Sequence, residues 1–186
     1  MAAEQTSLFE PDQPLADRIR PGALDEFVGQ DHLRPRITAL MSAKRLSSLL
    51  LFGPPGCGKS TLALIMARAQ RRPYLRVSAP EAGLQKLRKS LPGKDILVLD
   101  ELHRFSKAQQ DFFLPLLESG EVTLLATTTE NPSFSVTRQL LSRMHVLRLR
   151  ALKEEELAQI ATRGVEAMGV ELEEESLKLL ASMAGG

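Results

Sequence analysis

Hydrophobic and polar residues alternate along the first 150 positions in blocks that predict a parallel α/β sheet. Helical spacing or helix-start chemistry marks three segments, at 61–70, 80–91 and 106–118. Near-continuous apolar strands are typical of a sheet covered on both faces, so we expect a five-stranded parallel sheet between helices. The five runs with the length and the Leu, Ile and Val content of strands are 47–52, 74–78, 95–100, 122–128 and 146–150.

Two local signals bound the third helix of this pattern. Ser106 with Gln109 three residues later has the form of a capping box, and Gly120 fits a helix end. Beyond residue 150 the apolar residues return at helical spacing, over 153–169 and again over 172–186. The sequence therefore predicts three parts: a flexible tail at 1–14, an α/β domain at 15–150 and a second, helical module at 151–186.

Charge supports the same division of the chain. The helical module holds three basic and eight acidic residues, whereas 21 basic and 15 acidic residues fall in 1–150. This basic excess permits nucleic-acid binding without requiring it. A single cysteine, no signal-peptide pattern and no long apolar window predict a cytoplasmic protein without a disulfide and without a membrane partner.

The segment after the first apolar run matches the phosphate-binding loop, or Walker A, pattern in its strand–loop–helix context. Glycines allow backbone N–H groups to face phosphate oxygens, and the following helix adds its positive N-terminal end. We expect Lys59 to reach the β- and γ-phosphates and Ser60 to bind Mg²⁺. Cys57 fits a small residue at a variable loop position better than a redox switch. The residues expected to hold the nucleotide are Gly53, Pro54, Pro55, Gly56, Cys57, Gly58, Lys59, Ser60 and Thr61.

A pair of carboxylates ends the third apolar run, as in a Walker B motif. Asp100 and Glu101 follow four apolar residues, and the carboxyl ends of parallel strands form the ligand crevice of α/β sheets. We expect Asp100 to bind Mg²⁺ through water and Glu101 to polarise the attacking water, as phosphoryl transfer requires. Acidic residues that merely cap a surface strand are the alternative.

These motifs resemble the AAA+ ATPases, and within them the clamp-loader-like group. Residues 18–33 are similar to that group's N-terminal signature. Residues 100–134 resemble the RarA/MgsA family of replication-associated recombination ATPases, whose eukaryotic relative interacts with the Werner helicase. The match runs from about Pro14 to the last residue and implies ATP and Mg²⁺ as cofactors and a bacterial protein. It also implies an adenine pocket lined by Arg20, Pro21, Val28, Gly29 and Gln30.

The resemblance implies two further catalytic roles. Thr129 is expected as the first sensor of the γ-phosphate, with Thr128 as the adjacent candidate and a plain β-branched strand end as the alternative. Arg143 is expected to reach the nucleotide of the next subunit, although Met144 stands where clamp loaders have Cys. A solvated surface arginine is the alternative for Arg143.

The resemblance also bears on partners and on the extent of the chain. It implies DNA forks, ends and gaps as ligands, single-strand-binding protein as a partner, nucleoid association and a homotetramer. The chain stops where the family continues into its second-sensor arginine, so residues 151–186 are expected to be a partial helical lid of a longer protein. Within 80–91, Lys86, Arg88 and Lys89 are candidates for DNA contacts, with a solvated basic face as the equal alternative.

The N-terminal tail carries two large apolar side chains among polar residues and prolines. The segment 5–9 resembles the short motif by which bacterial replication proteins bind the sliding clamp, with Gln5 as anchor and Leu8 and Phe9 as the apolar pair. A polar tail cannot bury these side chains in a core of its own, which favours a partner's pocket. Packing of both side chains onto the domain is the alternative.

Four other functions compete with a DNA-coupled ATPase. A DExH helicase needs two tandem motor domains, for which 186 residues are too few. A Holliday-junction branch-migration motor carries an extra hairpin before its first sensor, for which the sequence leaves no room. A zinc-bearing clamp-loader subunit is excluded by the lone cysteine. A nucleotide-binding scaffold that does not hydrolyse ATP remains the alternative.

Overall fold

The computed structural model describes residues 14–79, 83–170, 172, 173, 176, 177, 179 and 183. Their contacts divide the chain into two compact units, one made of residues 21–153 and one made of the segments on either side of it. Residues 15–20, which the sequence pattern assigns to the α/β domain, therefore group with the helical segment, and the second boundary follows Lys153 rather than Arg150.

The first unit is built on a five-stranded parallel sheet with strand order β2-β3-β4-β1-β5. This confirms the predicted fold class. β1 lies between β4 and β5, with Leu49 level with Leu125 and His145. The carboxyl ends of all five strands therefore lie along one edge. The strands are β1 (Leu49–Phe52), β2 (Tyr74–Ser78), β3 (Ile96–Asp100), β4 (Thr123–Thr128) and β5 (His145–Arg148).

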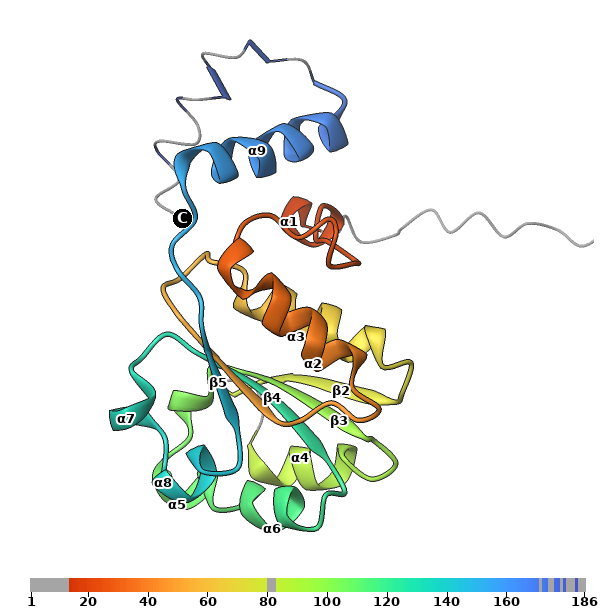
Figure 1. Cartoon of the computed structure of the whole chain (residues 1–186), viewed down its shortest axis with the longest axis vertical. Coiled ribbons are helices and arrows are strands. Elements are labelled where there is room, and N and C mark those ends of the chain that lie inside the picture. Colours follow the sequence, from red (N-terminus) through yellow and green to blue (C-terminus); the bar gives the residue numbers. More distant parts are fainter. Residues whose placement is uncertain are drawn as a thin grey trace, which may run out of the picture. The chain divides into compact units, whose positions relative to one another are not determined.

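Helices cover both faces of the sheet, as Figure 1 shows. Side chains along β1 alternate between the faces: Leu49 and Leu51 belong to the apolar core under α3, whereas Leu50 belongs to the core on the other face. The helices of one face are α2 (Arg34–Ser42) and α3 (Lys59–Ala69). Those of the other face are α4 (Leu84–Ser90), α5 (Lys107–Gln110), α6 (Phe113–Glu118) and α8 (Arg138–Leu141).

The helix predicted over 106–118 begins as expected but is broken in the middle. Ser106 and Gln109 form the complete capping box at the start of α5. The chain then leaves the helix at Asp111 and Phe112, before α6. Pro115 explains the break, because a proline has no N–H and its ring would collide with the carbonyl of Asp111 in a continuous helix.

The second unit pairs a short helix with a long one. α1 (Leu15–Arg18) lies against α9 (Glu154–Met168), and the Arg18 guanidinium donates to the Ala167 carbonyl at 2.8 Å. Gly164 lies beside Leu15 and Ile19, where a side chain would be in contact with both. The predicted helix at 153–169 is confirmed. The one predicted over 172–186 lies largely outside the described residues, and no described helix is both long and apolar enough to cross a membrane.

Candidate nucleotide site

The phosphate-binding loop connects β1 to α3 and depends on glycine at two left-handed positions, Gly56 (φ 73°) and Gly58 (φ 92°). A Cβ atom on Gly58 would lie 2.8 Å from the ring of Phe27. At the start of the loop, a Cβ on Gly53 would lie 2.6 Å from the carbonyl oxygen of Leu149. The loop is therefore packed tightly against two other segments. A side chain at Gly53 or Gly58 is excluded by this packing, apart from any need for the backbone to approach a phosphate.

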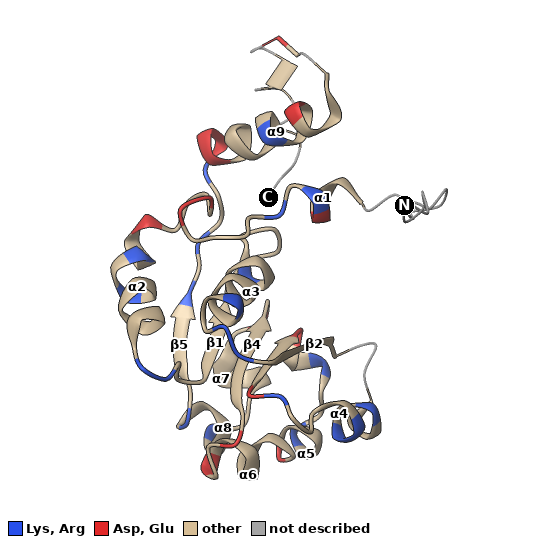
Figure 2. Cartoon of the chain, turned by 90° about the vertical axis from the view of Figure 1, so that its right-hand side faces the viewer, with Lys and Arg blue, Asp and Glu red and all other residues tan. Residues whose placement is uncertain are grey.

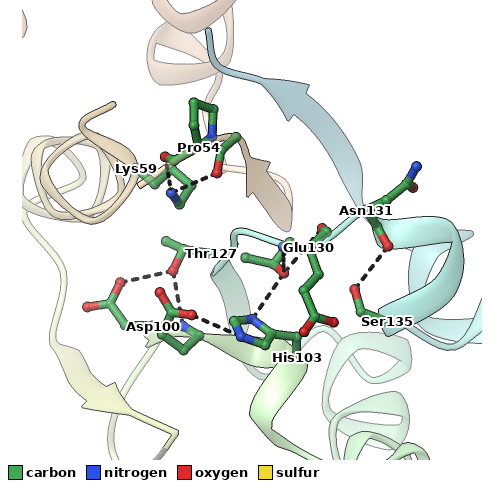
Figure 3. A network of polar contacts seen from close by, with 11 residues as sticks. Pro54, Lys59, Asp100, His103, Thr127, Glu130, Asn131 and Ser135 are labelled. Atoms are coloured by element: carbon green, nitrogen blue, oxygen red, sulfur yellow. Dashed lines mark hydrogen bonds and ion pairs between the residues drawn. The ribbon is translucent and has the colours of Figure 1, made fainter. Parts of the chain in front are cut away.

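Lys59 is folded back onto the loop. Its ammonium group donates to the carbonyl oxygens of Gly53 at 2.9 Å and Pro54 at 2.7 Å (Figure 3). The N–H of Leu62, in the first turn of α3, donates to the Gly58 carbonyl at 2.9 Å. The N-terminal end of a helix favours an anion.

A pocket of about 320 Å³ brings three of the predicted catalytic residues, Lys59, Glu101 and Thr129, together with Ser60. Lys59 and Ser60 come from α3, Glu101 from the end of β3 and Thr129 from the end of β4. Asp100 does not line this pocket. The complete lining is Pro55, Gly56, Gly58, Lys59, Ser60, Thr61, Glu101 and Thr129.

Asp100 lies behind the pocket with its carboxylate held on both sides. Its Oδ1 accepts from the Thr127 hydroxyl at 3.1 Å (Figure 3). Its Oδ2 lies 3.4 Å from the guanidinium of Arg76 on β2. Thr127 also accepts the Glu101 N–H at 3.1 Å, so one hydroxyl positions both carboxylate residues. Sequence reasoning missed Thr127 and Arg76, which only the strand register brings beside Asp100.

Glu101 occupies a left-handed backbone conformation, with φ 61°, that turns the chain from β3 into the short helix η2 (Leu102–Arg104). This turn brings His103 back beside the glutamate, with Nε2 3.2 Å from Glu101 Oε2. The other ring nitrogen, Nδ1, lies 3.2 Å from the Thr128 hydroxyl. Sequence reasoning assigned His103 no role.

The two first-sensor candidates are separated by the structure. Thr128 is fully buried and bonds His103 and the main chain of Glu130. Thr129 is half-buried and lines the pocket with Lys59 and Glu101. The geometry thus favours Thr129 as the residue next to the γ-phosphate.

The predicted adenine-pocket segment contains a buried amide. Gln30 is completely buried in a left-handed conformation, and its side chain bonds both the N–H and the carbonyl of Arg150, at 3.0 and 2.7 Å. It also donates to the Cys57 carbonyl at 3.4 Å. We therefore assign the Gln30 side chain to positioning the loop rather than to touching the base.

The other predicted adenine-pocket residues fall on both sides of the unit boundary. Val28 and Gly29 are buried, and Pro21 begins the α/β unit. Arg20 belongs to the helical unit and pairs with Asp17 at 2.7 Å.

Arg143 lies at the opposite edge of the sheet from the loop. It precedes His145, which pairs with Leu49 at the start of β1, whereas the loop follows the other end of β1. Its guanidinium forms an ion pair with Glu118 on α6 and donates to the Gln139 carbonyl at 2.8 Å. Its position excludes contact with the phosphate pocket of its own unit.

The predicted basic surface is on α4, whose Lys and Arg positions are coloured blue in Figure 2. Lys86, Arg88 and Lys89 are exposed. Arg88 lies over the ring of Phe112, 5.3 Å from its centroid, while Lys86 lines a separate pocket with Asp100. The three cations therefore do not form one uniform patch.

Cys57 fits the interpretation as a small loop residue. The thiol is buried, and burial raises its pKa above the ordinary value, although Lys59 acts in the opposite direction. A thiol with a raised pKa forms less of the reactive thiolate.

The donor set fits a nucleotide with a divalent cation. The described residues contain no group of three or more His, Cys, Asp or Glu side chains placed to hold a metal. Mg²⁺ usually takes only one or two protein ligands together with phosphate oxygens and water. Ser60 in the pocket and Asp100 behind it would supply those ligands.

Comparisons with known proteins agree with this geometry. The family model of the Holliday junction DNA helicase RuvB P-loop domain matches residues 19–147. Replication-associated recombination protein A of Escherichia coli K12 is 38% identical over 94% of this chain. The protein of the same name from Coxiella burnetii is 45% identical over 79%, and ATPase WRNIP1 of Dictyostelium discoideum is 36% identical over 93%.

Among solved structures, the Thermotoga maritima RuvB Holliday junction branch migration motor is similar, with a TM-score of 0.75 and 30% identity. The match covers 88% of this chain and 59% of that one. The chain spans 43% of the Escherichia coli relative, 36% of the Coxiella relative and 22% of the Dictyostelium relative. The resemblance inferred from the motifs, to AAA+ ATPases and to replication-associated recombination protein A, is confirmed.

Proposed function

Because this chain belongs to the family of the Holliday junction DNA helicase RuvB P-loop domain, we propose that it is an ATP-hydrolysing AAA+ protein of DNA replication and recombination. One observation carries the proposal. Lys59, Ser60, Glu101 and Thr129 surround a single pocket at the carboxyl edge of the sheet. A loop for phosphates and a carboxylate for water are both needed for phosphoryl transfer, and here they share one space.

The residues divide the work of hydrolysis among them. Lys59 exchanges its loop carbonyls for phosphate oxygens. Ser60, and Asp100 through water, would hold Mg²⁺, which would supply charge neutralisation on the phosphates. Glu101 orients a water whose oxygen forms the new bond to the γ-phosphorus as the bond to the β-phosphate oxygen breaks. The proton passes to Glu101, and Thr129 contacts the transferred group.

Calorimetry with ATP, followed by an ATPase assay, tests these roles. Lys59→Ala is expected to abolish ATP binding, since the buried cation is lost from the loop. Glu101→Gln keeps the size of the side chain and is expected to retain ATP binding within about twofold while lowering hydrolysis about 10²- to 10⁴-fold, the usual contribution of a general base. Equal loss of binding in both variants would contradict the assignment, and binding without hydrolysis in the unmodified protein would favour the scaffold alternative.

The proposal also covers the partners of the protein. The name of the Escherichia coli relative supports action on replicating or recombining DNA. A cytoplasmic location at the nucleoid stays a prediction. Forks, ends and gaps, single-strand-binding protein and a homotetramer stay predictions. The described residues between β3 and β4 form η2, α5 and α6 without a hairpin, which sets the chain apart from the branch-migration motor considered above.

Coupling to the sliding clamp also stays a proposal. Gln5, Leu8 and Phe9 lie outside the described residues. Titration of a labelled peptide of residues 1–14 with the clamp, against the same peptide with Leu8 and Phe9 replaced by Ala, tests it. Identical binding curves would remove the clamp from the partners.

A further inference from the structure

The proposed mechanism gives no role to the buried imidazole of His103. His103 belongs to η2, directly after the catalytic carboxylate, and its side chain is only 7% exposed. It does not line the phosphate pocket, which excludes direct contact with the reacting atoms. Any effect of His103 on hydrolysis therefore has to pass through another residue.

Both ring nitrogens of His103 are engaged, and their partners come from different strands. Nε2 lies 3.2 Å from the carboxylate of Glu101, at the end of β3. Nδ1 lies 3.2 Å from the hydroxyl of Thr128, the last residue of β4. The imidazole thus bridges the two strand ends that border the γ-phosphate position.

The bridge continues past Thr128. Its hydroxyl accepts the Glu130 N–H at 3.1 Å and lies 3.4 Å from the Glu130 carbonyl oxygen (Figure 3). The bond from the Glu130 N–H fixes the main chain that follows Thr129, whose side chain lines the pocket. The position of the first-sensor residue and that of His103 are consequently coupled through Thr128.

Hydrogen-bond chemistry fixes the direction of the contact with Glu101. An ionised carboxylate only accepts hydrogen bonds, so His103 Nε2 carries a hydrogen. Nδ1 then accepts from the Thr128 hydroxyl in the neutral ring or donates to it in the charged ring.

Among the described residues, the Glu101 carboxylate has an ion-pair or hydrogen-bond partner only in His103. The Glu101 side chain is 35% exposed, and its strained backbone is fixed by Thr127 only through the N–H. A glutamate has three rotatable side-chain bonds, and a misplaced carboxylate loses much of its effect on a water.

We propose that His103 is a positioning residue that holds the Glu101 carboxylate and ties its orientation to the Thr128–Glu130 segment. The inference rests on the proposed role of Glu101 in ATP hydrolysis. When the γ-phosphate draws Thr129 into contact, Thr128 moves His103 and the imidazole brings Glu101 to the water. Hydrolysis then begins only when the sensor segment is in place.

The complete protein provides the kinetic test. His103→Ala is expected to lower kcat about tenfold to a hundredfold, less than loss of Glu101 itself, with the Kd for ATP within about twofold. His103→Gln places an amide donor near the position of Nε2 and is expected to restore kcat to within about threefold. His145→Ala removes an exposed imidazole at the other edge of the sheet and serves as the matched control.

Thr128→Val tests whether His103 acts together with Thr128 or only holds Glu101 by itself. Thr128→Val removes the hydroxyl at nearly constant volume and is expected to lower kcat, whereas adding it to His103→Ala should cause a smaller loss than it causes alone, because only the Thr128 bond to Glu130 is then left to lose. Full activity of a folded His103→Ala protein overturns the proposal. Parallel losses of kcat, ATP affinity and melting temperature that Gln does not reverse overturn it equally.

An activity-independent readout distinguishes this inference from the proposed function. The chain has three histidines, so single substitutions assign every imidazole ¹⁵N signal. Glu101→Gln and Thr128→Val are expected to shift the ring nitrogens of His103 and to leave those of His145 unchanged. Unchanged His103 signals refute the bridge, even in a protein that proves unable to hydrolyse ATP.

Discussion

At the scale of single residues, the phosphate-binding loop depends on a glycine that meets an aromatic ring. Gly58→Ala would combine a left-handed backbone with a Cβ 2.8 Å from Phe27, atoms that cannot share that space. We expect the free energy of unfolding to fall by about 2–4 kcal/mol, from the left-handed conformation together with displacement of the ring. Chemical denaturation of the apo protein measures this loss.

Gly93→Ala is the matched control for the cost of placing alanine in a left-handed backbone conformation. Gly93 has φ 77°, similar to that of Gly58, but a Cβ there meets no atom within 4 Å. It should cost only the left-handed conformation, about 1–2 kcal/mol. If both variants lose the same stability, the contact with Phe27 contributes nothing.

At the scale of elements, the buried strands were the predictable part of the fold. All five lie within about two residues of the predicted runs, because covered parallel strands need apolar side chains on both faces. α2 was not predicted, since Ile37 is its only fully buried residue and the apolar pattern is correspondingly weak. The loop lysine and both carboxylates were predictable from local motifs, whereas Thr127 and His103 depend on strand register and on the turn at Glu101.

The basic helix α4 carries the prediction for DNA. Lys86→Glu together with Lys89→Glu is expected to reduce DNA-stimulated ATPase of the complete protein severalfold at low salt, because phosphate contacts are replaced by repulsion. Arg88 is left unchanged, since its contact with Phe112 would confound DNA binding with stability. Lys44→Glu, an exposed reversal outside α4, is the control. DNA stimulation equal to that of the unmodified protein would indicate a merely solvated basic face.

At the scale of the whole molecule, the distance between Arg143 and the loop predicts catalysis between subunits. Arg143 lies at the opposite sheet edge from Lys59, so a role for Arg143 at the phosphate pocket would need a second copy in head-to-tail contact. Arg143→Ala should lower kcat more than ATP affinity, as expected for a group that stabilises charge only in the transition state. Lys59→Ala should be inactive on its own.

Mixing these two variants before assembly should restore hydrolysis. Random assembly of equal amounts places an intact loop beside an intact arginine at roughly a quarter of the interfaces. Lys59→Ala mixed with the double variant Lys59→Ala, Arg143→Ala has no intact loop and serves as the inactive control. A mixture no more active than its components would falsify catalysis in trans.

The buried amide of Gln30 has a mechanical consequence. The Gln30 side chain bonds both the N–H and the carbonyl of Arg150, as the main chain of a neighbouring strand would. Its third hydrogen bond, to the Cys57 carbonyl, connects this segment to the phosphate-binding loop. Tension applied to the polypeptide after Ala151 is therefore borne by this amide before it reaches β5. A force that pulls on the helical segment therefore acts through Gln30 on the phosphate-binding loop before it acts on the sheet.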